Sequence, residues 1–276
     1  MRLTVFGMGY LGLTHAVCVA ELGHEVLGAE VDHDKVAKLA NGEVPFYEPG
    51  LAALLKKHLE SGLLRITTSY QDAADWGALY FIAVGTPQKK GESAADLRYV
   101  EAVIDGLAPL VRSEVLILGK STVPVGTCAK LVDRARALST EGEIEIAWNP
   151  EFLREGYAVH DTLTPDRIVL GRTEGGRAET LTREVYATIL ERDTPFIVTD
   201  PETAELVKVS ANAFLATKIS FINAIAEVCD AVGADVRAVA DAIGYDARIG
   251  RRFLNAGLGF GGGCLPKDIR AFAHRA

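Results

Sequence analysis

Short apolar runs alternate with amphipathic stretches over the first two thirds of the chain. Such runs, bounded by polar or glycine-rich segments, are typical of strands buried on both faces of a parallel sheet. They lie at residues 3–6, 25–29, 79–84, 115–118 and 144–148, and the segments 96–111 and 127–138 have helical periodicity between them. The alternation predicts an α/β fold with a Rossmann-type, doubly wound parallel sheet, which the apolar runs 167–170 and 195–198 extend.

The pattern becomes helical after residue 199. Asp200 is a suitable N-cap, Pro201 occupies the first turn, and no proline or glycine follows before Gly233, which can close the helix in the left-handed conformation. Residues 235–243 predict a second helix, a glycine-rich loop follows, and another helix starts near Lys267. We therefore expect two domains, a Rossmann domain at 1–199 and a long-helix α domain at 200–276.

Composition narrows the class of protein. The 276 residues carry a net charge of −8, which argues against a broad surface for nucleic acid or anionic lipid. No apolar run reaches the length of a membrane span, and no secretory signal precedes the first strand. The cysteines lack any C-x-x-C pair, and the histidines have no metal-ligand spacing. We expect a cytoplasmic protein with no bound metal and no membrane or nucleic-acid partner.

The glycine motif Gly7-Met-Gly-Tyr-Leu-Gly12 follows the first predicted strand and opens a helix. Glycines at these positions allow a tight turn and bring backbone N–H groups close to a pyrophosphate. Glu30 ends the second predicted strand, where an acid accepts hydrogen bonds from ribose hydroxyls and repels a 2′-phosphate. This arrangement predicts NAD rather than NADP. Lys35 either touches the adenosine end or is solvated.

Two further segments end predicted strands and are candidates for the same cleft. They are Val84-Gly-Thr-Pro87 and Lys120-Ser-Thr-Val-Pro124. Loops at the carboxyl ends of parallel strands bind ligands in α/β sheets. Each segment taken alone is equally compatible with an ordinary turn.

Cys264 is the candidate nucleophile. It follows a run of glycines, stands at or just before a helix start, and is followed by Lys267 and Asp268. A helix N-terminus and a nearby cation both favour the thiolate. The alternative is an unreactive cysteine at a turn.

Other polar residues form candidate partners for that chemistry. Lys208 and Asn212 lie one turn apart on the long helix and can stabilise an alkoxide or oxyanion, the alternative being a surface lysine with an incidental neighbour. Glu151 and Glu155 follow the strand at 144–148, where one carboxylate can act as a base, although a lone glutamate is more often surface decoration. Arg248 begins a basic cluster that can contact a pyrophosphate; the alternative is a run of solvated charges.

The ordered set of motifs resembles the UDP-glucose/GDP-mannose dehydrogenase family over nearly the whole chain. The matching segments are Gly7–Gly12, Glu48-Pro-Gly-Leu51, Val84–Pro87, Ser121–Pro124, Asn149-Pro-Glu-Phe-Leu-Arg-Glu-Gly156, Lys208 with Asn212, and Gly261-Gly-Gly-Cys-Leu-Pro-Lys-Asp268. The resemblance is strongest to the UDP-glucose 6-dehydrogenase branch. It implies oxidation of the C6 alcohol of UDP-glucose to the carboxylate of UDP-glucuronate with two NAD, through a thiohemiacetal and a thioester on Cys264.

The resemblance also implies roles for individual residues. Lys208 and Asp268 would orient water and stabilise oxyanions, Thr122 and Glu151 would assist proton transfer, and Asn212 would join this catalytic set. NAD would contact Gly7, Met8, Gly9, Tyr10, Leu11, Gly12, Glu30, Lys35, Val84, Gly85, Thr86, Pro87, Ser121, Thr122, Glu155 and Lys267. The sugar nucleotide would contact Glu151, Phe152, Leu153, Arg154, Glu155, Lys208, Asn212, Arg248, Phe253, Leu254, Asn255, Ala256, Gly257 and Gly261. Arg248 would act across a homodimer built on the long helix.

The sequence departs from the family pattern in three respects. Glu30 replaces the usual aspartate, Gly263 stands where serine is common, and the family's C-terminal base-binding domain is not among the 276 residues. We expect this chain to bind NAD but to turn over poorly alone. The alternatives are a GDP-mannose or UDP-N-acetylhexosamine 6-dehydrogenase, a two-electron hydroxyacid dehydrogenase, and a non-enzymatic NAD-binding dimerisation module.

Overall fold

A computed structural model describes residues 1–261 and 265–275 of the chain. The chain divides into two compact units. The first comprises Met1–Pro87 with Ala95–Leu206, and the second comprises Gln88–Ala94 with Val207–Ala276. Cys264, the predicted nucleophile, lies outside the described residues.

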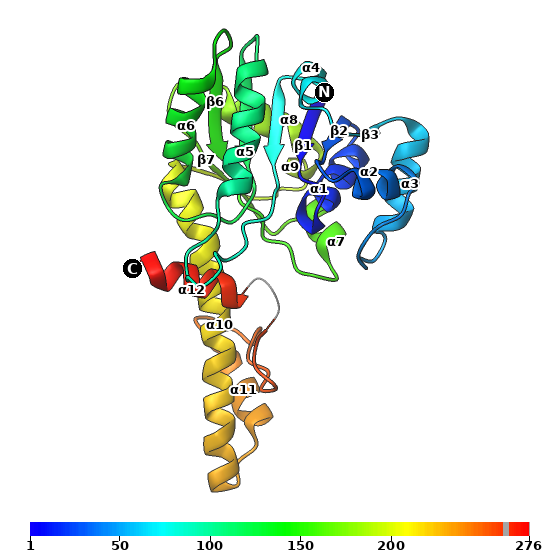
Figure 1. The fold of residues 1–276 in the computed structure, drawn as a ribbon. Coiled ribbons are helices and arrows are strands. Elements are labelled where there is room, and N and C mark those ends of the chain that lie inside the picture. Colours follow the sequence, from blue (N-terminus) through cyan, green and yellow to red (C-terminus); the bar gives the residue numbers. More distant parts are fainter. Residues whose placement is uncertain (262–264, 276) are drawn as a thin grey trace. The chain divides into compact units, whose positions relative to one another are not determined.

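A mostly parallel sheet forms the centre of the first unit (Figure 1). Its spatial order is β3-β2-β1-β4-β5-β6-β7-β8, which confirms the doubly wound prediction and the extension by β7 and β8. The strands are β1 (Arg2–Phe6), β2 (Glu25–Ala29), β3 (Leu64–Thr67), β4 (Leu79–Ile82), β5 (Val115–Gly119), β6 (Ile144–Trp148), β7 (Ile168–Gly171) and β8 (Phe196–Thr199).

Two features of the sheet differ from the sequence prediction. β3 was not predicted, because this edge strand combines a buried Leu64 with an exposed Arg65 and two half-buried residues, and so lacks the continuous apolar run of the central strands. β7 pairs with β6 antiparallel, at Trp148 and Gly171, whereas the other neighbouring strands are parallel. An apolar strand gives no sign of its direction, because the direction depends on how the connection folds back.

Helices cover both faces of the sheet, with α1 and α8 on one face and α5 and α6 on the other (Figure 1). The helices of this unit are α1 (Tyr10–Glu21), α2 (His33–Ala40), α3 (Leu51–Ser61), α4 (Tyr70–Trp76), α5 (Arg98–Leu107), α6 (Thr127–Leu138), α7 (Ala158–Leu163), α8 (Ala178–Val185) and α9 (Ala187–Leu190), with a 3-10 turn at Ala108–Leu110. α5 begins two residues later than the expected 96, because the Asp96 carboxylate accepts the Arg98 N–H and forms a turn before the helix.

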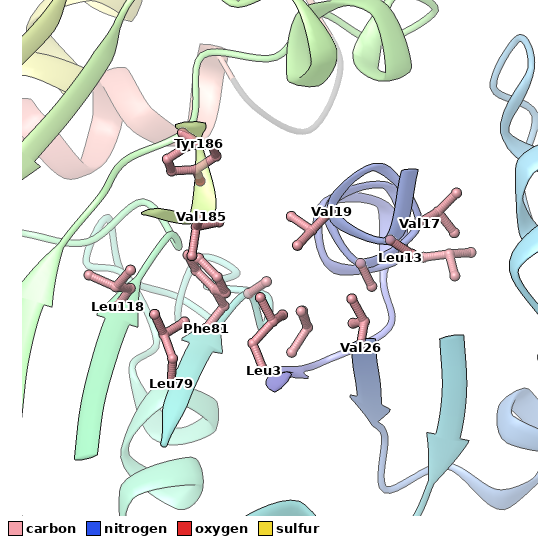
Figure 2. Close-up of a cluster of buried hydrophobic side chains, with 14 of the residues drawn as sticks. Leu3, Leu13, Val17, Val19, Val26, Leu79, Phe81, Leu118, Val185 and Tyr186 are labelled. Carbon is pink, nitrogen blue, oxygen red and sulfur yellow. The ribbon is translucent and has the colours of Figure 1, made fainter. Parts of the chain in front are cut away.

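The main core lies between the sheet and the helices on its α1 face. Figure 2 shows Leu3 and Phe81 from the strands against Val19 of α1 and Val185 of α8. These side chains are fully or almost fully buried, and burial of each large apolar side chain stabilises the fold by about 1.5–3 kcal/mol. The core therefore fixes the strand ends from which the candidate site is built.

The long helix α10 (Pro201–Val232) has the predicted bounds. The Asp200 carboxylate accepts the Thr203 N–H at 2.7 Å, and Gly233 closes the helix with a φ of +72°. The remaining described helices are α11 (Val236–Gly244), whose Asp235 N-cap accepts the Arg237 N–H, and α12 (Leu265–Arg275). The predicted caps therefore set the ends of α10, whereas the Asp235 cap of α11 was not predicted.

By length and composition α10 is also able to span a membrane, and it is the one such helix among the described residues. Less than a quarter of its most apolar stretch is buried. The expectation that no segment reaches this length was wrong. Polar residues interrupt the apolar positions, so no continuous run is visible, yet the average over the helix remains apolar.

Candidate cofactor and substrate site

The predicted cofactor segments meet at one edge of the first unit. β1 and β4 are neighbours where the strand order reverses, and the glycine loop and Val84–Pro87 follow them. The Ser121 hydroxyl donates to the Val84 carbonyl, and the Thr86 hydroxyl donates to the Thr122 carbonyl, both at 2.7 Å. Such a reversal at the carboxyl edge is the position at which open α/β sheets bind ligands.

The glycine loop has different steric requirements at its three glycines. Gly7 has a φ of +90°, and a Cβ there would lie 2.8 Å from Val84 Cγ1. A Cβ on Gly12 would lie 1.7 Å from the Gly7 carbonyl oxygen. Gly9 faces open space, with nothing within 4 Å of its ideal Cβ, and it is the N-cap of α1 without a side-chain cap. The loop therefore offers helix N–H groups to a ligand with no side chain in the way, which fits a pyrophosphate.

Glu30 lies at the end of β2, 9% exposed. Its carboxylate accepts the N–H groups of Met8, Val31 and Asp32, and the Lys35 ammonium contacts Oε2 at 2.8 Å. Burial alone would raise the pKa of Glu30, but Lys35 and the backbone donors outweigh it and the pKa is lowered. The carboxylate is thus ionised at neutral pH.

A pocket lies beside Glu30. It is formed by the end of β1 with the glycine-loop start, the end of β2, the start of α4, the end of β4 and α5, and its lining consists of Phe6, Gly7, Ala29, Glu30, Val31, Thr68, Ser69, Tyr70, Val84 and Val103. An acid at the ribose end, an open helix N-terminus and a part-apolar pocket together fit a dinucleotide.

The loop after β6 is anchored by Asn149, which is buried. Its Oδ1 accepts the Lys120 ammonium and the Tyr186 hydroxyl, both at 2.9 Å, and its Nδ2 donates to the Val169 carbonyl. Burial raises the pKa of Tyr186, so its hydroxyl stays protonated. This buried network, which the sequence prediction missed, fixes where the loop 150–157 begins.

The predicted substrate residues of that loop make contacts within the first unit. Glu151 accepts the Leu153 N–H at 2.5 Å, and the Phe152 ring lies 3.9 Å from the Arg167 guanidinium. The Arg154 guanidinium is paired with Asp161. Burial would raise the pKa of Asp161, but its hydrogen bonds from Arg154 lower it overall. Glu155 is exposed.

In the second unit, a polar cluster joins α10 to α12. The Asn212 amide donates to Asp268 Oδ2 at 2.7 Å, and the Lys267 ammonium lies 2.8 Å from Asp268 Oδ1. Asp268 and Lys208 are 3% and 6% exposed. Three of the predicted catalytic or cofactor residues are therefore in direct contact, although the adjoining Cys264 lies outside the described residues.

The predicted sugar-nucleotide segment 253–257 is also held by α10. Asn223 Oδ1 accepts the Gly257 N–H at 2.8 Å, and Leu254 is buried beside Ile222. Phe253 has a φ of +67°, a left-handed conformation that costs a non-glycine residue energy and persists only where the surrounding structure holds it. Asn255, Ala256 and Gly261 are exposed.

Arg248, which the resemblance assigns to the partner's sugar nucleotide, pairs with Asp246 at 2.7 Å and is mostly exposed. The loop that carries it is fixed by the Lys218 ammonium, which donates to the carbonyls of Ile249 and Gly250. Lys218 and Asn223 were not predicted. In the sequence they are two of several polar residues along α10, and no motif distinguishes them from the others.

Comparison with known proteins identifies the family. Residues 1–190 match the NAD binding domain of the UDP-glucose/GDP-mannose dehydrogenase family, and residues 202–276 match its central domain. UDP-glucose 6-dehydrogenase of Rhizobium meliloti (strain 1021) is 43% identical over 100% of this chain and 63% of its own length. UDP-glucose 6-dehydrogenase TuaD of Bacillus subtilis (strain 168) is 45% identical over 98% and 58%.

A solved structure is similar over the same region. The UDP-glucose dehydrogenase from the hyperthermophilic archaeon Pyrobaculum islandicum superposes with a TM-score of 0.94 and is 42% identical, over 99% of this chain and 63% of that protein. The chain thus spans about 60% of the length of the curated relatives that it matches. It belongs to the UDP-glucose/GDP-mannose dehydrogenase family, of which it contains the NAD binding and central domains.

Proposed function

We propose that a protein containing this chain, together with the remaining part of its relatives' length, oxidises the C6 alcohol of UDP-glucose to the carboxylate with two NAD. The observation that carries the proposal is the hydrogen bond between Asn212 and Asp268. Asp268 follows the predicted nucleophile Cys264 in the sequence, and this bond holds it against Asn212 of α10. The sequence similarity to UDP-glucose 6-dehydrogenases supports the choice of sugar nucleotide.

The first unit supplies the residues that would hold the cofactor. The glycine loop and the α1 N-terminus suit the pyrophosphate, and the ionised Glu30 suits the adenosine ribose with Lys35 beside it. NAD, when bound, accepts a hydride in each of the two oxidations. The hydroxyls of Ser121 and Thr86 hydrogen-bond the loop after β4 to the loop after β5.

The remaining chemistry belongs to the protein's own side chains. The C6 alcohol first becomes an aldehyde, to which the Cys264 thiolate adds. Oxidation of this adduct gives a thioester, which water hydrolyses to the carboxylate and the free thiol. Lys208 stabilises the oxyanions and Asp268 orients the water, while Thr122 and Glu151 assist proton transfer.

Counting NADH per carboxylate tests the reaction in the longer protein. We expect two NADH per UDP-glucuronate formed. Cys264→Ser should slow carboxylate release by roughly a hundredfold or more, because an ester route replaces the thioester. Cys229→Ser, at a buried cysteine of α10, is the matched control and should retain activity. Carboxylate release at the normal rate by Cys264→Ser would rule out the thioester route, and one NADH per product would indicate a two-electron dehydrogenase.

Thiol labelling tests the nucleophile in the 276-residue chain itself. Burial raises the pKa of the Cys18 and Cys128 thiols to about 12, so both are un-ionised at pH 8. Iodoacetamide should therefore modify Cys264 much faster than these two, as mass spectrometry of the digested protein would reveal. Labelling of Cys264 no faster than of Cys128 would contradict the assignment.

We further propose a Rossmann domain at 1–199 and a helical domain at 200–276, a homodimer built on α10, and a cytoplasmic location. For the 276 residues alone we propose NAD binding with little turnover. Titrating NAD and UDP-glucose separately into the chain tests this. Tight binding of UDP-glucose would contradict a role restricted to cofactor binding and dimerisation.

A further inference from the structure

Glu48 is a buried carboxylate that the proposed reaction does not use. It lies in the loop between α2 and α3 and is 5% exposed. Its Oε2 accepts the Tyr10 hydroxyl at 2.5 Å and the Gly156 N–H at 2.9 Å, and its Oε1 accepts the N–H groups of Ala158 and Val159 at 2.8 and 3.4 Å. One side chain therefore bonds to two distant segments of the first unit.

The first of these segments is the glycine loop. Tyr10 is the first residue of α1, directly after Gly9, so its backbone borders the position proposed for the pyrophosphate. Its ring packs against Phe46, and its hydroxyl also accepts the Gly156 N–H at 3.2 Å. Burial and the bond to Glu48 raise the pKa of Tyr10, so the hydroxyl remains a proton donor at neutral pH.

The second segment is the end of the loop after β6 and the start of α7. α7 packs against α1 and has no side-chain cap of its own at Tyr157. Glu48 caps it instead, from 110 residues away, and satisfies the N–H groups of its first residues and of Gly156. The loop 150–157, which carries Glu151 and Glu155, is thus fixed at this end by Glu48, as it is at its other end by Asn149.

We propose that Glu48 is a positioning residue for the cofactor, which sets the glycine loop and the loop 150–157 in register through Tyr10 and the α7 N-terminus. The inference rests on the NAD-binding part of the proposed function. An acid is required because all the partners are donors, and only a carboxylate accepts at both oxygens. The consequence is that disturbance at Glu48 affects the pyrophosphate turn, while the adenosine pocket around Glu30 is unaffected.

The test compares NAD with AMP, which carries the adenosine end but lacks the second phosphate and the nicotinamide half. Glu48→Gln turns an amide donor toward a backbone N–H. It should raise the Kd of NAD by roughly tenfold, and Tyr10→Phe should raise it by roughly threefold. The Kd of AMP should change by less than about twofold in both variants. The double variant should bind NAD no more weakly than Glu48→Gln, since both changes break one linkage.

Controls come from the same loop. Tyr47→Phe and Glu43→Gln alter exposed residues and should leave both affinities unchanged. Tyr10→Phe keeps the three backbone bonds of Glu48, so it remains informative should Glu48→Gln fail to fold. Three results would overturn the inference. They are an equal weakening of AMP and NAD binding, additive effects of Glu48→Gln and Tyr10→Phe in the double variant, or an unchanged NAD affinity in Tyr10→Phe. Failure of the unaltered chain to bind NAD would overturn the proposed function and this inference with it.

Discussion

At the residue scale, two glycines of the glycine loop are required for different reasons: Gly12 by the packing of the fold, and Gly9 by the approach of a ligand. The ideal Cβ of Gly12 collides with the carbonyl of Gly7, whereas that of Gly9 meets nothing within 4 Å. Gly9 also has φ and ψ of −76° and −166°, which any residue adopts without strain. The fold alone therefore does not require glycine at position 9, whereas a ligand that approaches the backbone closely does.

Two substitutions in this loop should accordingly have different effects, one mainly on stability and the other mainly on NAD binding. Gly12→Ala should lower the free energy of unfolding by about 1–3 kcal/mol, because the helix must move away from the Gly7 carbonyl. Gly9→Val should lower the free energy of unfolding by no more than about 1 kcal/mol, the cost of a poorer N-cap residue. It should raise the Kd of NAD by roughly tenfold or more, because its side chain occupies the approach to the α1 N-terminus. Thermal unfolding and calorimetric titration measure both. Normal NAD binding by Gly9→Val would contradict the assigned pyrophosphate position.

At the scale of elements, the start of α10 caps another helix. The Glu205 carboxylate, 2% exposed, accepts the N–H groups of Gly126 at 2.6 Å and Cys128 at 2.7 Å, at the N-terminus of α6. Glu205→Ala should lower the free energy of unfolding by about 2–4 kcal/mol, because it leaves the buried Cys128 N–H and the partly buried Gly126 N–H without an acceptor. Denaturant unfolding gives this value, and a loss below the error of the measurement would contradict the capping role.

The same carboxylate has a predictable effect on pH dependence. Burial raises the pKa of Glu205, and the backbone donors only partly offset the increase. The folded state therefore binds the carboxyl proton of Glu205 more tightly than the unfolded state does. The contribution of Glu205 to stability consequently declines as the pH rises above its unfolded pKa of about 4.5. Relative to the non-titrating Glu205→Gln, the unaltered chain should be more stable at pH 5 than at pH 8. The opposite slope would show that the bonds to α6 outweigh burial.

At the scale of the whole molecule, α10 carries exposed apolar side chains at heptad spacing. Phe214, Phe221 and Val228 are 65%, 49% and 56% exposed, and they repeat every seven residues on the helix. A second copy of the chain would bury such a stripe. Phe221→Asp should therefore convert a dimer into a monomer in sedimentation velocity, while Ser220→Asp, at the adjacent exposed position, should not.

The apolar character of α10 also requires a test of the membrane alternative. Flotation with lipid vesicles distinguishes dimerisation through α10 from insertion of α10 into a membrane, because a protein that only dimerises stays in the lipid-free fraction. A monomeric unaltered chain, or one that floats with the vesicles, would contradict the dimer proposal.

Much of the fold followed from the sequence because its signals are local. Apolar runs predicted the central strands, and Asp200 and Gly233 marked the ends of α10 through chemistry that acts within one helical turn. The edge strand β3 and the direction of β7 were not predictable in this way, since both depend on which strand lies alongside. The motifs likewise predicted which loops meet at the cofactor edge, but not the hydrogen bonds that hold them together.

The sequence by itself determined the sheet class, the glycine loop, the acid at the end of β2 and the pairing of Lys208 with Asn212 on one helical face, because each depends on residue type and short spacing. Only the tertiary structure decided that Glu48 bonds to Tyr10 and caps α7, that Glu205 caps α6, and that Asp268 accepts from Asn212. A buried carboxylate bonds to whichever donors the packed elements bring to it. Its partners are set by the fold rather than by the sequence around it.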